Sequence, residues 1–181
     1  MTTRYVGVGG NDSNSGLTWA LRKLTLNGVE DTPVEAGDTV YVGAGTYRET
    51  LTCDVSGSSG SPITYIGDYT GANTDGVGGE VRITGSDNDT TLTRANCIIA
   101  SSKNFRTFNG FRFDSTTGVL ISLESCTDTI ITNCYFEGGV YAVQHQGAEQ
   151  LRTTIQNCAF NNSNLIGIYL YHSAAVDDTA H

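Results

Sequence analysis

Two carboxylates occupy matching places in a repeated sequence pattern, and an arginine lies beside them. Asp114 and Glu137 each follow a phenylalanine, Asn161 holds the next equivalent position, and Arg112 and Tyr135 form a neighbouring column. If the repeats stack, the two carboxylates lie one strand spacing apart and raise each other's pKa. Such a pair can hold calcium, or flank a glycosidic bond at the roughly 5 Å separation of retaining glycosidases. The alternative is a solvated column at a turn, where water screens like charges.

Aromatic side chains gather toward the C-terminal end, where alternate strand residues are expected to face solvent. They are Tyr135, Tyr141, Tyr169 and Tyr171. Exposed tyrosines are good platforms for sugar rings or protein partners, since the ring is apolar and the hydroxyl can form hydrogen bonds. The alternative is that they pack under loops.

Other groups able to do chemistry lack a supporting motif. Asp87 and Asp89, like Asn11 and Asp12, do not reproduce the spacing of a calcium-binding loop and are predicted to form turns. His145 is predicted to face inward, and no histidine accompanies a serine or cysteine nucleophile motif.

The cysteines are expected to be free and mostly buried. There are five, an odd number at wide spacings without a C-x-x-C pair, which argues against a zinc site or a redox pair. A buried thiol behaves as a small apolar group. The cysteines are Cys53, Cys97, Cys126, Cys134 and Cys158.

Composition limits the classes of partner. The 181 residues suit one domain, and the net charge is −9 with only two lysines, so no basic face is available for nucleic acid. No apolar run reaches the length of a membrane span. The first residues lack the basic start and apolar stretch of a signal peptide, so we expect synthesis in the cytoplasm without secretion.

A repeat of constant length dominates the second half of the chain. The segments 108–113, 131–136 and 155–160 share an apolar first position and a phenylalanine five residues later, with a period of 23 and then 24 residues. A second apolar strand follows each segment, and the consensus of a leucine-rich repeat is absent. A fixed period in the twenties without helical patterning predicts a solenoid.

The repeat predicts the coils of a parallel β-helix. Equivalent residues would stack at roughly the 4.8 Å spacing of neighbouring strands. The first positions then form one inward stack and the phenylalanines another, while Gly110, Asn133 and Asn157 occupy the bend between them, where glycine and asparagine tolerate positive φ. Cys134 is expected to lie against Cys158.

The sequence before the repeats predicts a cap and the first coils. Residues 1–37 are expected to form a strand, a loop and one short amphipathic helix over Ala20–Leu26 that covers the first coil. Residues 38–181 are expected to form the β-helix. The short strands predicted there include Thr39–Val42, Ile63–Ile66, Val81–Thr84, Ile98–Ala100 and Leu165–Leu170.

Three segments carry a resemblance to a known family. These are Gly37–Glu49, Gly60–Asp68 and the Ile-x-Asn-Cys-x-Phe repeats, preceded by Gly10–Gly16 and Trp19. Together they resemble the N-terminal half of right-handed parallel β-helix proteins of the pectate-lyase-like superfamily. The resemblance implies an all-β solenoid with an N-terminal capping helix. Its lyases use calcium-binding aspartates and a catalytic arginine on one strand face, for which the comparable residues here are Asp114, Glu137 and Arg112.

Three functions are compatible with these features. The favoured one is a non-enzymatic spike, fibre or decoration subunit of a bacteriophage virion that contacts a glycan or host surface. The alternatives are a polysaccharide lyase or glycoside hydrolase, and a secreted surface adhesin. Because residues 171–181 suggest no cap for the last coil, we expect either a continuing chain or a homo-oligomer, with a trimer favoured.

Overall fold

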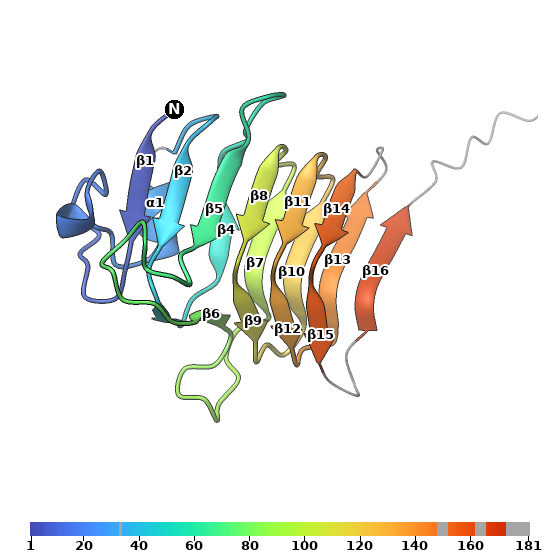
Figure 1. Cartoon of the computed structure of the whole chain (residues 1–181). Coiled ribbons are helices and arrows are strands. Elements are labelled where there is room, and N and C mark those ends of the chain that lie inside the picture. The colour runs from blue at the N-terminus through green and yellow to red at the C-terminus, as the bar shows by residue number, and fades with distance from the viewer. Residues whose placement is uncertain (33, 148–151, 162–165, 173–181) are drawn as a thin grey trace, which may run out of the picture.

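The computed structural model describes residues 1–32, 34–147, 152–161 and 166–172. The chain winds through three parallel sheets that run side by side along the molecule (Figure 1). Sheet A contains, in spatial order, β1 (Thr3–Val6), β2 (Thr39–Val42), β5 (Ile63–Gly67), β8 (Arg106–Asn109), β11 (Thr129–Thr132) and β14 (Thr153–Gln156). Sheet B contains β3 (Gly45–Tyr47), β6 (Val81–Thr84), β9 (Arg112–Asp114), β12 (Tyr135–Glu137) and β15 (Ala159–Asn161). Sheet C contains β4 (Leu51–Cys53), β7 (Asn96–Ser101), β10 (Val119–Glu124), β13 (Tyr141–Gly147) and β16 (Ile166–His172).

The predicted inward stacks are present. In sheet A, Phe108 is paired with Ile131, which is paired with Ile155. In sheet B the phenylalanine rings stack face to face, with centroids 5.3 Å apart between Phe113 and Phe136 and 5.1 Å between Phe136 and Phe160. Alternate strand positions point to the same face, so Phe108, Ile131, Phe113 and Phe136 are buried in the core, while Ile155 and Phe160 of the last coil continue the stacks with more exposure. The predicted parallel β-helix is therefore confirmed.

The bends between sheets A and B use the left-handed backbone conformation. Gly110 has a φ of 81°, Asn133 of 52° and Asn157 of 53°, as predicted for these positions. Asparagine accepts this conformation more readily than other residues that carry a Cβ. The Asn133 amide also donates to Asn109 Oδ1 at 2.8 Å, so the asparagines of consecutive coils are linked.

The predicted helix over Ala20–Leu26 is wrong in its bounds. The structure has a single 3₁₀ turn, η1 (Trp19–Leu21), and a separate helix α1 (Leu26–Glu30). Between them Lys23 is extended and pairs with β1, since its N–H donates to Tyr5 O at 2.9 Å. Asp12 Oδ1 accepts hydrogen bonds from the N–H groups that follow, of Leu24 and Thr25. These hydrogen bonds hold the segment that was predicted as helical in an extended conformation.

A new N-cap starts α1 after that interruption. Thr25 Oγ1 accepts a hydrogen bond from Gly28 N at 2.9 Å, which is the usual side-chain cap of a helix start. Glu49 adds a second acceptor, because its Oε1 accepts a hydrogen bond from the N–H of Leu26 at 2.9 Å. The predicted capping role is confirmed at the shifted position: α1 packs on β1 and β4, and Leu26 and Val29 join the core.

A buried ion pair ties α1 to the coils. Arg106 of β8 is 1% exposed and Glu30 of α1 is 4% exposed. Arg106 Nη1 donates to Glu30 Oε1 at 2.6 Å, and the Tyr65 hydroxyl donates to the same oxygen at 2.5 Å. Arg106 also donates to the carbonyl of Val55. All the polar groups involved therefore have partners, which a buried pair requires.

The remaining predictions about the fold have different outcomes. All five cysteines are free, four buried and Cys158 half-buried. Strand β1, from the predicted N-terminal segment 1–37, pairs in parallel with β2 and so belongs to sheet A. Leu165 and residues 173–181, which include the predicted uncapped end, lie outside the described residues. In the part of the chain that is described, no helix is long and apolar enough to span a membrane.

Candidate functional site

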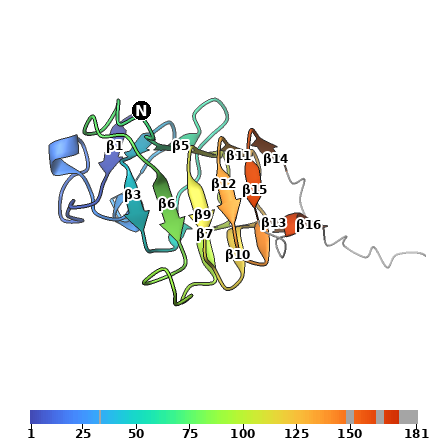
Figure 2. The same cartoon turned by 60° about the horizontal axis from the view of Figure 1, so that its bottom comes forward.

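The outer face of sheet B carries the predicted charged residues. Figure 2 turns this sheet toward the viewer. In the register of β9 and β12, Asp114 is paired with Glu137 and Arg112 with Tyr135. In the register of β12 and β15, Glu137 is paired with Asn161. The two columns expected from the repeats are therefore present in the structure.

Two arginines bind the carboxylate of Asp114. This side chain is buried, with the residue only 2% exposed, and its Oδ2 accepts a hydrogen bond from Arg82 Nε at 2.7 Å. Arg112 Nε lies 3.1 Å from the same oxygen. The hydrogen bond to Asp114 raises the pKa of Arg82. The alternative of a solvated column is therefore wrong for Asp114, which is held in a buried ion pair.

Arg112 also binds two further carboxylates. Its Nη2 donates to Glu137 Oε2 at 2.5 Å, and its Nη1 donates to Glu80 Oε1 at 3.2 Å. Burial lowers the pKa of Arg112, but the hydrogen bond to Glu80 and the neighbouring negative charges outweigh it and raise the pKa. One guanidinium thus lies among three carboxylates. It offsets the repulsion expected between Asp114 and Glu137.

The charge network continues into the loop after β6. Asp89 accepts hydrogen bonds from Arg48 Nη2 at 2.7 Å and from Arg82 Nη1 at 2.5 Å, which lower the pKa of Asp89 to about 2. Asp89 has a φ of 64°, and Asp87 pairs with Arg94 at 2.6 Å. Both aspartates therefore hold the loop in place, in keeping with their predicted role in turns.

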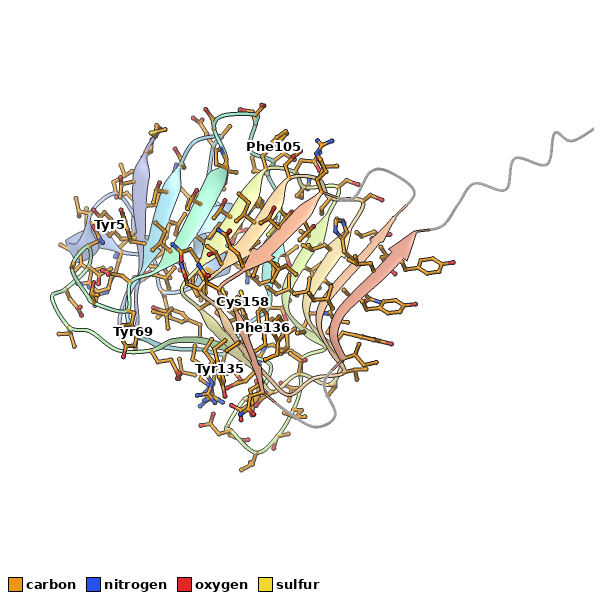
Figure 3. The ribbon with its side chains drawn as sticks, turned by 45° about the vertical axis from the view of Figure 1, so that its right-hand side comes forward. Tyr5, Tyr69, Phe105, Tyr135, Phe136 and Cys158 are labelled. Atoms are coloured by element: carbon orange, nitrogen blue, oxygen red, sulfur yellow. The ribbon has the colours of Figure 1, made fainter. Side chains whose placement is uncertain are left out.

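A pocket opens beside the network, lined in part by Tyr69, Glu80, Arg112, Asn133 and Tyr135. Tyr69 is 68% exposed, and Figure 3 shows it on the same lower side of the molecule as Tyr135. The Cζ of Arg112 lies 5.5 Å from the centroid of the Tyr135 ring, within the range of a cation–π contact. The pocket therefore combines two tyrosine rings with a guanidinium group.

The four predicted tyrosines lie on two sheets. Tyr135 belongs to sheet B, and its hydroxyl accepts a hydrogen bond from Asn161 Nδ2 at 2.8 Å. Tyr141, Tyr169 and Tyr171 belong to sheet C. The ring centroids of Tyr141 and Tyr169 are 4.9 Å apart, and Tyr171 is 51% exposed. The structure therefore divides the predicted set between two faces.

Three residues of this face were absent from the sequence prediction: Tyr69, Glu80 and Arg82. Tyr69 lies in the turn after β5, outside the repeats, so its position had no signal in their spacing. The position of Arg82 did have such a signal, because Arg82 pairs in register with Arg112, and an apolar and then a polar residue follow each of them. Recognising that earlier coil would have predicted the second arginine of the network.

Metal binding is the other role considered for Asp114 and Glu137. Within the described ranges, no group of three or more His, Cys, Asp or Glu side chains is placed to hold a metal ion. Calcium binding at the two carboxylates stays a prediction.

His145 faces inward as predicted and is fully buried, with Nδ1 2.7 Å from Thr153 Oγ1.

Solved structures with a similar fold include a rhamnogalacturonan lyase and a GH136 lacto-N-biosidase from Eubacterium ramulus. The lyase matches with a TM-score of 0.64 and 18% identity, over 94% of this chain and 54% of its own. The biosidase matches with a TM-score of 0.59 and 14% identity, over 94% of this chain and 34% of its own. This chain therefore spans about a third to a half of their length. No protein-family model and no curated protein matches it.

These likenesses define the class of fold. The chain is a parallel β-helix, and helix makes up only 5% of the residues that the structure describes.

Proposed function

We propose that the chain is a glycan-binding β-helix module, with its site on the outer face of sheet B. The observation that carries the proposal is the pocket where Tyr69 and Tyr135 accompany the guanidinium of Arg112. Tyrosine rings pack against the apolar faces of sugar rings, and arginine supplies several hydrogen-bond donors for hydroxyl or carboxylate oxygens. The two structural neighbours, both named as carbohydrate-active enzymes, support the proposal.

The geometry favours binding over cleavage at this site. General acid–base catalysis requires a carboxyl group within hydrogen-bond reach of the reacting atoms. Asp114 is buried and paired with Arg82 and Arg112, and Glu137 is paired with Arg112, so an arginine lies against each carboxylate that a glycosidic bond would have to approach. The lyase or hydrolase alternative is the less favoured one for this reason.

Calorimetric titration with a small panel of oligosaccharides tests the proposal. The panel comprises rhamnogalacturonan, polygalacturonate and lacto-N-biose-containing fragments, each with and without calcium. We expect binding of at least one fragment, weakened about fivefold by Tyr135→Ala, because loss of an aromatic contact costs about 1 kcal/mol. The control is Tyr171→Ala on sheet C. Binding of no fragment, or equal losses in both variants, would contradict the proposal.

A second candidate function is that of an assembling structural subunit, such as a spike or fibre subunit of a bacteriophage virion. It rests on apolar residues at inward positions of the last described coil that are nevertheless exposed: Phe160 at 40%, Ile168 at 45% and Leu170 at 65%. A second copy of the chain covering this surface would remove it from water. Light scattering of the purified protein tests this candidate. We expect the mass of a trimer, and the mass of a monomer would contradict the candidate.

A further inference from the structure

Two cysteines lie against each other on consecutive coils. Cys134 follows Asn133 and Cys158 follows Asn157, and both asparagines have the same left-handed backbone, so the two cysteines leave their bends in equivalent positions. The strands that follow are in direct contact, because the N–H of Ala159 donates to Cys134 O at 2.9 Å. Figure 3 labels Cys158 near Phe136, in the last coils.

The two thiol groups differ in their surroundings. Cys134 is only 3% exposed, whereas Cys158 is half-buried. Each thiol donates to a backbone carbonyl of its own coil, Cys134 Sγ to Thr132 O at 3.2 Å and Cys158 Sγ to Gln156 O at 3.3 Å. The neighbouring Cys134 thiol lowers the pKa of Cys158 to about 6, whereas the interaction with Cys158 and burial raise the pKa of Cys134. Cys158 therefore carries the sulfur that a reagent in solution can reach. A thiolate is the form of cysteine that attacks a disulfide.

We propose that Cys134 and Cys158 form a reversible disulfide that joins consecutive coils of the β-helix. Stacked strands lie roughly 4.8 Å apart, which falls within the roughly 4.4–6.8 Å range of Cα separations found in disulfides. The register supports this spacing, because each cysteine directly precedes one member of the paired residues Tyr135 and Ala159. This site is independent of the proposed glycan pocket, since it needs no sugar.

The oxidant is a low-molecular-weight disulfide such as glutathione disulfide. The Cys158 thiolate attacks one of its sulfur atoms, which forms a mixed disulfide and releases one glutathione thiolate. Cys134 then loses its proton and attacks the Cys158 sulfur, which releases the second glutathione. The protein loses two protons and two electrons in total, and the oxidant takes them up and is reduced to two thiols.

The experiment treats the folded, full-length chain with glutathione disulfide and follows its mass and its melting. We expect loss of two hydrogens, a Cys134–Cys158 cross-link in the peptide map, and a rise in Tm of roughly 5–10 °C, because the bond restricts the unfolded chain. Reduction should restore the starting mass and Tm. Unchanged mass, or a cross-link between other cysteines, would overturn the proposal.

Three variants separate the two roles. Cys134→Ser should retain one glutathione on Cys158, because no second thiol resolves the mixed disulfide. Cys158→Ser should give neither adduct nor cross-link under the same exposure, since the buried Cys134 lacks access to the oxidant. Cys126→Ser is the control, a substitution of another buried cysteine that should leave the cross-link intact. A persistent glutathione adduct on the wild-type chain would contradict the assignment of Cys134 as the resolving thiol.

Discussion

Arg112 shows how one side chain can define the chemistry of a surface. Its guanidinium lies against the ring of Tyr135 and binds Glu80, Asp114 and Glu137, so the same group neutralises the carboxylates and borders the pocket. The carboxylates alone suggest a catalytic or calcium site. With the arginines beside them, the same residues form a surface of paired charges. In the proposed glycan site, a sugar oxygen would compete with Glu80 for the guanidinium.

His145 gives the stability of the chain a dependence on pH. Its burial lowers its pKa from the ordinary value of 6.5, so the unfolded chain takes up this proton first as the pH falls. The stabilisation from neutral His145 is present above about pH 6.5 and declines below it. Denaturant unfolding at several pH values should show a smaller decline for His145→Leu than for the wild type. Equal declines would assign the pH dependence to other groups.

At the scale of elements, the attachment of α1 depends on the buried pair of Glu30 and Arg106. Arg106→Met leaves the Glu30 carboxylate buried without its partner, and we expect a loss of about 3–5 kcal/mol in the free energy of unfolding. Arg152→Met is the matched control, because Arg152 pairs with Asp128 at the surface and such pairs contribute less than about 1 kcal/mol. Chemical denaturation measures both. Similar losses would show that burial does not set the strength of these pairs.

The coils could be predicted from the sequence because their period is carried by large apolar residues. Phe108, Ile131 and Ile155 mark the stack, and the pairing of consecutive coils places them in one column. The path of Ala20–Leu26 could not be predicted in this way, because hydrogen-bond acceptors on side chains determine its backbone conformation. Asp12 holds residues 24 and 25 extended, and Thr25 then caps the helix that follows.

The candidate site was predictable only where it belongs to the repeats. Arg112, Asp114, Tyr135 and Glu137 share one register, so their proximity followed from the spacing. Arg82 could have been predicted as well, from the match between β6 and β9. The second wall of the pocket could not, because it depends on irregular segments of the early coils, such as the turn that carries Tyr69, whose paths no repeat specifies.

At the scale of the whole molecule, the two ends of the solenoid differ. Helix α1 covers the core at the N-terminal end, whereas Leu170 lies exposed in the last described coil. If a second copy covers that surface, Leu170→Glu should convert the assembly to a monomer, because a buried unpaired charge opposes association. Leu24→Glu, at the exposed N-terminal loop, is the control and should keep the assembly. Light scattering of both variants decides the matter, and an unchanged mass for Leu170→Glu places the contact elsewhere.

The in-register stacking of Phe113, Phe136 and Phe160 also bears on how such a molecule changes length over generations. Each coil contacts only the coil before it and the coil after it. A tandem duplication of one period in the gene would therefore add a layer that meets the same neighbours as the original. The molecule would lengthen by roughly 4.8 Å while its cross-section stayed constant. Length is thus a heritable variable in this architecture that can change without redesign of the core.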